Sequence, residues 1–450
     1  MHVRKIGLML LAILALLAYS HFKPLRQSAG RSGTALAELT DEATSSLAKL
    51  PPVGESIAFF HNRIRQNPQD VVSYTLLGEL YLRQGRETGD VASYQRAEAA
   101  LQKAIQLLPD YAPANASLAA VLYVQHNFSQ ALEMAQQVYL SSPKNIQALA
   151  TVGDAQLALG HYTESEQAYQ KLLQASPSPA VQARLAHLAE LKGQTDEALQ
   201  LMQIAAQEAL NAGGSREGVA WYWLRLGDLS FNSGQIEDAE KYYQGAIKIF
   251  DGYYLGLAGL GKVRTAQGNY EAAIELYQRV TDIIPQPDFL AALGDLYILT
   301  DQPEKAKLQY DTVEYIGKLA EINRQVYNRQ LAYFYADHDL NVEAALRLAL
   351  AELEYRQDIY GYDVTAWAYF KNGLFDQAEA MMQQAMKLGT RDAKLYYHAG
   401  LIARAQGREA EAQRLLAEAL AINPHFDPLQ ARQARAALDQ LASISQGAAP

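Results

Sequence analysis

The chain has 450 residues, of which 49% are hydrophobic and 20% charged, and its formal net charge is -10. This composition excludes an intrinsically disordered chain, and the length indicates either several domains or an array of stacked repeats. The acidic balance disfavours nucleic acid as a partner, because a nucleic-acid site needs a basic surface. Cysteine is absent, which excludes disulfides, thiolate metal sites and thiol catalysis.

The N-terminus has the composition of a targeting segment. Arg4 and Lys5 precede an uninterrupted apolar run, Ile6–Tyr19, which is the order found in signal peptides and membrane anchors. As a helix this run would span about 21 Å, less than the hydrocarbon core of about 30 Å, so its length favours a signal peptide. The small residues Ala18 and Ser20 fit a cleavage site, whereas the positive charges that follow favour an uncleaved anchor. Both alternatives stay open.

A regular repeat covers most of the chain beyond this segment. Pro109, Pro143 and Pro177 recur at intervals of 34 residues, and Ala239 and Ala273 are separated by the same interval. A fixed period of this size is typical of stacked helical hairpins, in which each proline ends the second helix of a pair. The sequence therefore predicts an array of helices without strands.

The residues inside each repeat resemble the tetratricopeptide-repeat (TPR) family. Its signature places an aromatic residue or Leu, then Leu-Gly and Tyr on the first helix, with Ala, a large apolar residue and Pro on the second. The first-helix matches are Tyr74, Leu77, Gly78 and Tyr81; Trp223, Leu226 and Gly227; Leu257, Leu260 and Gly261; Leu290, Leu293, Gly294 and Tyr297; and Tyr396, Ala399 and Gly400. The resemblance implies an all-α, right-handed superhelical solenoid of about ten helix-turn-helix hairpins, with capping helices at both ends. It also implies a protein that binds other proteins rather than an enzyme.

The organisation along the chain follows from the targeting segment and the repeats. The predicted parts are a signal peptide or membrane anchor at 1–22, a linker at 23–55, an N-terminal capping half-repeat at 56–70, the repeat array at 71–424, and a C-terminal capping helix and tail at 425–450. Three repeats exceed the usual length. We expect an enlarged turn after Tyr81, a flexible joint after Ala198 and a further insertion near Val313.

Two motifs that could carry chemistry have structural explanations. Gly256–Lys262 matches a phosphate-loop string, but Val263 replaces the Ser or Thr that holds magnesium, and the pattern places the string inside a helix. Asp337, His338 and Asp339 could be metal ligands, but they fall in a hairpin turn where an Asp would cap the next helix. We therefore predict no catalytic, cofactor-binding or metal-binding residues, and no cofactor.

A second stripe of residues on the first helices is predicted to bind partners. Positions 2, 5, 9 and 12 lie on one face at helical spacing, and in TPR proteins this face lines a concave groove. Its C-terminal part is aromatic, as binding surfaces often are, although a chain with 28 Tyr could place aromatic residues there without a function. The predicted partner-binding residues are Trp221, Phe231, Tyr333, Tyr360, Trp367, Phe370, Tyr397 and Arg404. We expect Trp367→Ala to weaken partner binding without unfolding the array.

These observations predict a non-catalytic scaffold, exported or tethered to a membrane, that binds protein or peptide partners in its concave groove. The predicted setting is bacterial cell-envelope assembly, secretion or transport. The alternative is a cytosol-facing, membrane-anchored adaptor that recruits soluble proteins, and an enzyme with an unrecognised site is a remote third possibility. The sequence leaves the partner, the membrane topology and the oligomeric state open.

Overall fold

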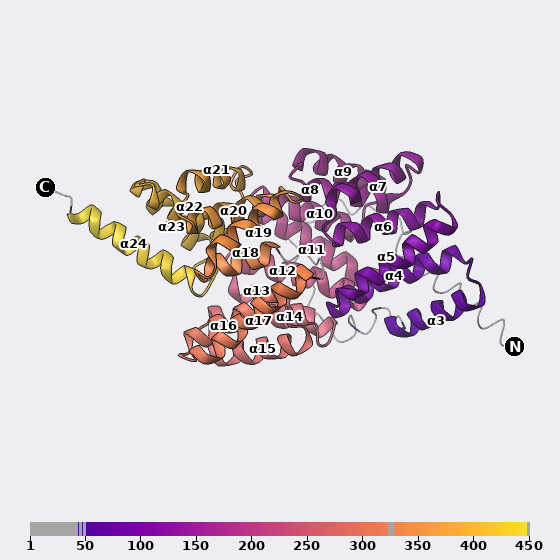
Figure 1. Cartoon of the computed structure of the whole chain (residues 1–450), viewed down its shortest axis with the longest axis horizontal. Coiled ribbons are helices and arrows are strands. Elements are labelled where there is room, and N and C mark those ends of the chain that lie inside the picture. The colour runs from indigo at the N-terminus through magenta and orange to yellow at the C-terminus, as the bar shows by residue number, and fades with distance from the viewer. Residues whose placement is uncertain (1–43, 45–46, 48–50, 323–327, 448–450) are drawn as a thin grey trace.

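The computed structural model describes residues 44, 47, 51–322 and 328–447 (Figure 1). Over these residues the fold consists of helices α3 to α24 without a β-strand, which confirms the predicted all-α solenoid. The targeting segment predicted at 1–22 lies outside the described residues. Among the described helices, none is long and apolar enough to cross a membrane.

The helices form ten successive hairpins between one preceding and one following helix. The preceding helix is α3 (Val53–Gln66) and the following helix is α24 (Gln430–Gly447). The hairpins are α4 (Val71–Thr88) with α5 (Ala92–Leu107), α6 (Ala112–Val124) with α7 (Phe128–Ser141), α8 (Ile146–Ala158) with α9 (Tyr162–Ala175), α10 (Pro179–Leu191) with α11 (Thr195–Ala212), α12 (Arg216–Asn232) with α13 (Ile236–Ile249), α14 (Tyr254–Ala266) with α15 (Tyr270–Ile283), α16 (Pro287–Leu299) with α17 (Pro303–Ile322), α18 (Asn328–Asp337) with α19 (Val342–Leu353), α20 (Ile359–Lys371) with α21 (Phe375–Ala385), and α22 (Ala393–Ala405) with α23 (Glu409–Ile422).

Each hairpin is fixed by a small residue on one helix and a large residue on the other. In the pair α12 and α13, a Cβ atom added to Gly227 would lie 2.5 Å from Cε1 of Tyr243. Glycine at this position therefore lets the Tyr243 ring pack directly on the backbone of α12, and the ring is fully buried. Ala239 on α13 is also fully buried, so both small residues of the repeat allow close packing.

The extra residues of the longer repeats extend helices instead of turns. Helix α4 continues to Thr88 and ends at Gly89 in the left-handed conformation, so the enlarged turn predicted after Tyr81 is wrong. Helices α11 and α12 have 18 and 17 residues, which leaves only 213–215 between them, and α17 has 20 residues. An inserted segment made of residues compatible with a helix adds hydrogen-bonded turns to that helix, whereas a loop would leave its backbone groups unpaired.

The first helices of successive hairpins form the inner layer of the array. They contact one another directly, for example α6 with α8 and α18 with α20, in addition to their own second helices. Among the described helices, extensive contacts join only helices of the same or neighbouring hairpins, together with α3 to α4 and α24 to α23. This nearest-neighbour arrangement is the one expected for a solenoid.

Successive turns of the superhelix also touch each other along a line that we call the seam. Here the turn inside one hairpin meets the segment that follows the hairpin five places further along the chain. Hydrogen bonds across the seam join residues 197, 199 and 192 positions apart in the sequence, and Figure 1 shows α8 to α10 beside α19 and α20. The seam consists of Gly89 with Ile284; Ala158, Gly160 and Tyr162 with Gln357 and Ile359; Leu191 and Gly193 with Gly389 and Thr390; and Phe231 and Gly234 with Ile422 and Asn423.

Candidate functional site

A carboxylate follows the small residue of the first helix in several hairpins and binds the same tyrosine that packs there. Gly227 precedes Asp228, whose Oδ1 accepts a hydrogen bond from the Tyr243 hydroxyl at 2.9 Å. The equivalent bonds are Tyr169 to Asp154 at 2.9 Å and Tyr310 to Asp295 at 2.7 Å. These carboxylates also bind cations or imidazoles: Arg225 binds Asp228, Arg184 binds Asp154, and His338 binds Asp295.

This Gly-Asp pair with a tyrosine fifteen residues later was missed by the sequence analysis, although it can be read from the sequence. In the structure, the three carboxylates are bound within the chain. Each of them orients a tyrosine, and Asp154 and Asp295 also link neighbouring hairpins, so their first role is structural.

Asp337 links four helices at the C-terminal end of the array. Its Oδ1 accepts hydrogen bonds from Trp367 Nε1 at 2.8 Å and from Gln430 Nε2 at 2.7 Å, and its Oδ2 binds Lys394 Nζ at 2.8 Å. These partners lie on α20, α24 and α22. Burial opposes ionisation of Asp337, but the adjacent Lys394 ammonium, together with His398 and His338, outweighs it and holds the pKa of this carboxyl below its usual value.

The capping role predicted for an Asp in the turn of Asp337, His338 and Asp339 is wrong. Helix α19 is capped by Asn341, whose side chain accepts from the backbone N–H of Ala344. Asp337 is instead the last residue of α18, and Asp339 binds Lys371. Over the described part of the chain, no group of three or more His, Asp or Glu residues could hold a metal ion.

Asp363 and His398 form a pair that resembles an acid–base unit but is closed to solvent. His398 Nδ1 lies 2.9 Å from Asp363 Oδ1, and the Tyr333 hydroxyl donates to Asp363 Oδ2 at 2.6 Å. The exposed fraction is 0% for His398 and 1% for Asp363. The cluster connects α18, α20 and α22. Because a substrate could not reach either group, it is a poor candidate for catalysis.

Comparisons with known proteins agree with the helical geometry. One family model described as a tetratricopeptide repeat matches 125–188 and 230–296, and a second one matches 364–425. The chain belongs to the tetratricopeptide-repeat family. No curated protein matches its sequence.

Several solved structures are similar to this TPR chain at low sequence identity. Yeast Tom70 is 14% identical over 88% of this chain and 95% of its own, with a TM-score of 0.34. A monomeric mutant of IFIT1 with Gppp-AAAA is 16% identical over 74% of this chain and 76% of its own, with a TM-score of 0.46. A tetratricopeptide repeat protein from Parabacteroides merdae is 18% identical over 61% of this chain and 99% of its own, with a TM-score of 0.34.

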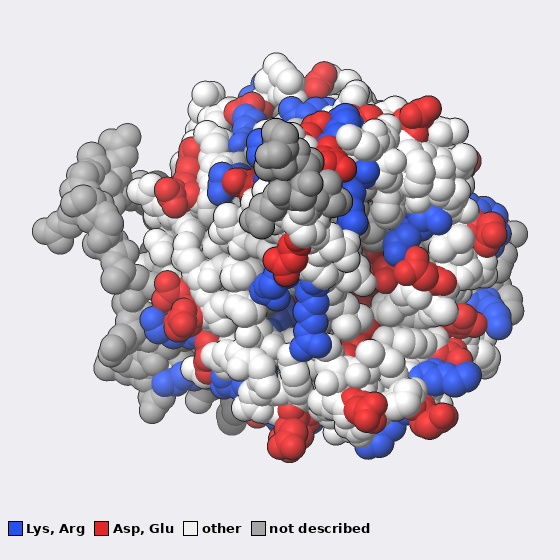
Figure 2. All heavy atoms as spheres, turned by 90° about the vertical axis from the view of Figure 1, so that its left-hand side faces the viewer, with Lys and Arg blue, Asp and Glu red and all other residues white. Residues whose placement is uncertain are grey.

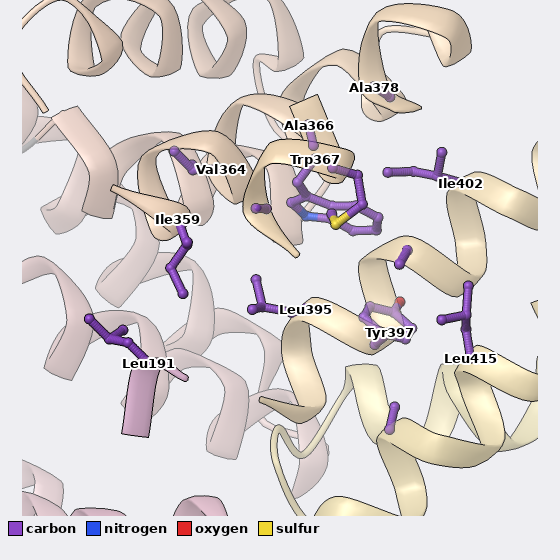
Figure 3. Close-up of a cluster of buried hydrophobic side chains, with 14 of the residues drawn as sticks. Leu191, Ile359, Val364, Ala366, Trp367, Ala378, Leu395, Tyr397, Ile402 and Leu415 are labelled. Atoms are coloured by element: carbon purple, nitrogen blue, oxygen red, sulfur yellow. The ribbon is translucent and has the colours of Figure 1, made fainter. Parts of the chain in front are cut away.

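Three residues predicted to lie open in the TPR groove are buried. Trp367 is 1% exposed: its ring stacks on His398 with centroids 4.1 Å apart and on Phe370 at 4.9 Å. Figure 3 shows Trp367 and Tyr397 inside a cluster of apolar side chains, and Tyr397 and Phe231 are buried as well. The expectation of an open aromatic surface is wrong at these three residues. Neighbouring repeats cover Phe231, and the next repeat and the C-terminal segment cover Trp367 and Tyr397.

Four further predicted residues are partly buried, and three of them make hydrogen bonds within the chain. Tyr333 binds Asp363, the Tyr360 hydroxyl donates to Asp392 Oδ2 at 3.3 Å, and Arg404 donates to Gln440 at 2.7 Å. Phe370 lies between the rings of Trp367 and Phe375. These side chains are accessible only at their edges, since most of each surface is already in contact with the array.

Trp221 is the most accessible of the predicted aromatic residues. It lies on α12, in the middle of the array, with an exposed fraction of 36%, and its ring meets the edge of Tyr222 at 5.2 Å. The next two first helices, α14 and α16, present the exposed residues Lys262 and Asp288. We call Trp221, Lys262 and Asp288 the open stripe.

The open stripe faces the inside of the superhelix. Asp288 is exposed to solvent, yet desolvation by the surrounding protein raises the pKa of its carboxyl, while Lys262 and Lys394 oppose this rise. Because the first helices form the inner layer of the array, an exposed side chain on them lies on its concave side. Lys394 belongs to α22, so helices from the middle and from the C-terminal end of the array contribute to this space.

Proposed function

We propose that this protein is a non-catalytic scaffold that binds a protein or peptide partner on the concave side of its TPR array. The TPR fold is typically such an interaction scaffold, and the family assignment supports this general role. The specific site that we propose is the open stripe of Trp221, Lys262 and Asp288. Trp221 carries the proposal, because an exposed tryptophan on the concave face of a TPR array is the type of residue that anchors partners.

A peptide is a better candidate than nucleic acid for this site. On the face shown in Figure 2, Lys and Arg side chains alternate with Asp and Glu without a continuous basic area, and the net charge is -10. The open stripe likewise contains one positive and one negative side chain beside the tryptophan. Mixed charges suit the main chain and polar side chains of an extended peptide, whereas a phosphate backbone would be repelled.

The arrangement of the phosphate-loop string supports a scaffold over an enzyme. Gly256–Lys262 lies in α14, a first helix, and not in a loop that follows a strand. Gly261 lies against Tyr277, since a Cβ atom there would be 2.6 Å from the ring. The glycines of this string therefore serve helix packing.

Photocrosslinking in cells tests the proposed site. A benzoylphenylalanine at Trp221 should yield a defined covalent adduct with a partner protein, because its ring would replace the proposed anchor. The control is the same residue at Leu374, which has a similar exposed fraction of 37% but lies at the start of α21, away from the open stripe. Adducts of equal yield and identity at both positions would contradict the proposed site.

We also place this scaffold at a membrane or outside the cytoplasm of a bacterial cell, in envelope assembly, secretion or transport. The support for this proposal is the apolar run Ile6–Tyr19 behind Arg4 and Lys5. Deleting 1–20 should move the protein from the membrane or periplasmic fraction to the cytosol. A reporter fused after Pro450 distinguishes the exported scaffold from a cytosol-facing adaptor, and a cytosolic, unprocessed full-length chain would contradict both.

A further inference from the structure

The seam is a buried contact with its own apolar and polar parts. Leu191 from α10 lies opposite Ile359 and Leu395 within one hydrophobic cluster (Figure 3). The hydroxyl of Thr390 donates to the carbonyl oxygen of Leu191, and Asn423 Nδ2 donates to the carbonyl oxygen of Phe231 at 2.7 Å. Ile359, Thr390 and Asn423 are all at most 3% exposed. The seam thus consists of two facing ridges, the hairpin turns on one side and the segments that follow the later hairpins on the other, and their contact is closed to water.

Two glycines set the distance between the ridges. A Cβ atom added to Gly160 would lie 2.3 Å from the carbonyl oxygen of Gln357, and one added to Gly193 would lie 2.3 Å from that of Gly389. Atoms this close would force the backbones apart. The seam therefore depends on the absence of a side chain at these two turns.

Gly268 and Gly373 provide a matched comparison within the same chain. They occupy the equivalent hairpin turns with φ values of 75° and 72°, against 76° and 72° at Gly160 and Gly193, but an added Cβ would meet nothing within 4 Å. The turn conformation itself accepts a side chain, because His126, Asp301 and Asp339 adopt positive φ at the corresponding turns of other repeats. Asparagine is among the residues that tolerate this conformation best.

We propose that the seam is a lock that holds the TPR array closed. Extensive helix contacts link only neighbouring hairpins, so over the described residues successive superhelical turns are held together along the seam. Opening the seam would leave each hairpin and its neighbours intact while widening the superhelix. The lock would thereby limit access to the open stripe, a consequence that rests on the proposed partner site.

Spin-label distances measure the lock without any partner. The chain has no cysteine, so Gln235→Cys and His425→Cys can be labelled selectively in the full-length protein. Both positions are exposed and flank the seam beside Gly234 and Asn423, outside the two substituted turns. The seam variant combines Gly160→Asn with Gly193→Asn. The control variant combines Gly268→Asn with Gly373→Asn and carries the same change of turn residue without a seam contact.

We expect a single short distance in the parent protein and in the control variant. The seam variant should shift to longer and broader distances while its helix content, followed by circular dichroism, stays that of the control. An unchanged distance in the seam variant, or equal lengthening in the control, would overturn the lock. Loss of helix content in the seam variant alone would also overturn it, because the seam would then be part of the folding core. Failure of the partner site leaves these distances unaffected, so the two proposals can fail separately.

Discussion

The hydroxyl group of Tyr243 donates a hydrogen bond to Oδ1 of Asp228 at 2.9 Å, from the second helix of a hairpin to the first. The bond forms because Gly227 lets the Tyr243 ring lie against α12 and places the hydroxyl beside the next residue. One glycine thus determines both the packing of the ring and the position of its polar end.

Removing the Tyr243 hydroxyl should destabilise the array more than removing the hydroxyl of a tyrosine that packs in the same way but has no Asp beside it. Tyr243→Phe loses a buried hydrogen bond to a carboxylate, worth about 1–3 kcal/mol of unfolding free energy. Tyr277→Phe is the control: Tyr277 packs on Gly261 in the same way, but Lys262 stands where the three repeats with the tyrosine–carboxylate bond have Asp. The control should change stability by less than about 0.5 kcal/mol. Urea denaturation of both variants checks this difference, and equal losses would contradict the role of Asp228.

Truncation of the two tryptophans should reduce stability by very different amounts. Trp367→Ala removes a ring that is 1% exposed and should cost about 3–5 kcal/mol of unfolding free energy through the cavity it leaves. Trp221→Ala removes a ring that is 36% exposed and should cost less than about 1 kcal/mol. Melting temperatures of the two variants compare these costs. A stable Trp367→Ala protein would restore Trp367 as a candidate binding residue.

Asp337 should be essential for stability, whereas its neighbour Asp339 should not. Asp337→Asn keeps the shape of the side chain but leaves Lys394 without its carboxylate partner, which should cost about 3 kcal/mol. Asp339→Asn breaks only the bond to Lys371, where the carboxylate is 69% exposed, and should cost less than about 1 kcal/mol. Equal effects in chemical denaturation would show that the four-helix link through Asp337 is unimportant.

His126 should make the array less stable in mild acid. Burial, together with the nearby Arg356, lowers the pKa of His126 to about 3 from its usual 6.5. A lowered pKa means that the unfolded chain binds the proton more readily. The contribution of His126 is therefore complete above pH 6.5 and declines as the pH falls toward 3, by up to about 1.4 kcal/mol per pH unit.

A substitution at His126 isolates this effect. His126→Asn keeps a residue that tolerates the positive φ of this turn, and it should lose about 2 kcal/mol less than the parent between pH 7.5 and 5. His338 is present in both proteins, so its contribution to the pH dependence of stability cancels when the two profiles are compared. The urea midpoint at each pH provides the measurement, and parallel pH profiles would rule out His126 as the source.

The repeat period predicted the hairpins because local packing determines them. Glycine, alanine and tyrosine at fixed spacing leave one way for two helices to approach, as Gly227 and Tyr243 show. The same reasoning assigned Trp367 to an open groove, because helix spacing identifies a face without showing what covers it. Trp367 is covered by His398 of the next repeat. Closure of the superhelix, which joins residues as far apart in the sequence as Leu191 and Thr390, 199 positions, buries further residues that the repeat pattern leaves open.

Binding of defined peptides to the purified full-length chain tests the central claim most directly. Peptides selected from a random display library on the parent protein should lose at least about tenfold in affinity with Trp221→Ala, which corresponds to the loss of one aromatic anchor. Affinity should stay unchanged with Leu374→Ala, a substitution of similar exposure away from the open stripe. If the selected peptides bind the Trp221→Ala protein as tightly as the parent, the open stripe is not the binding site of this array.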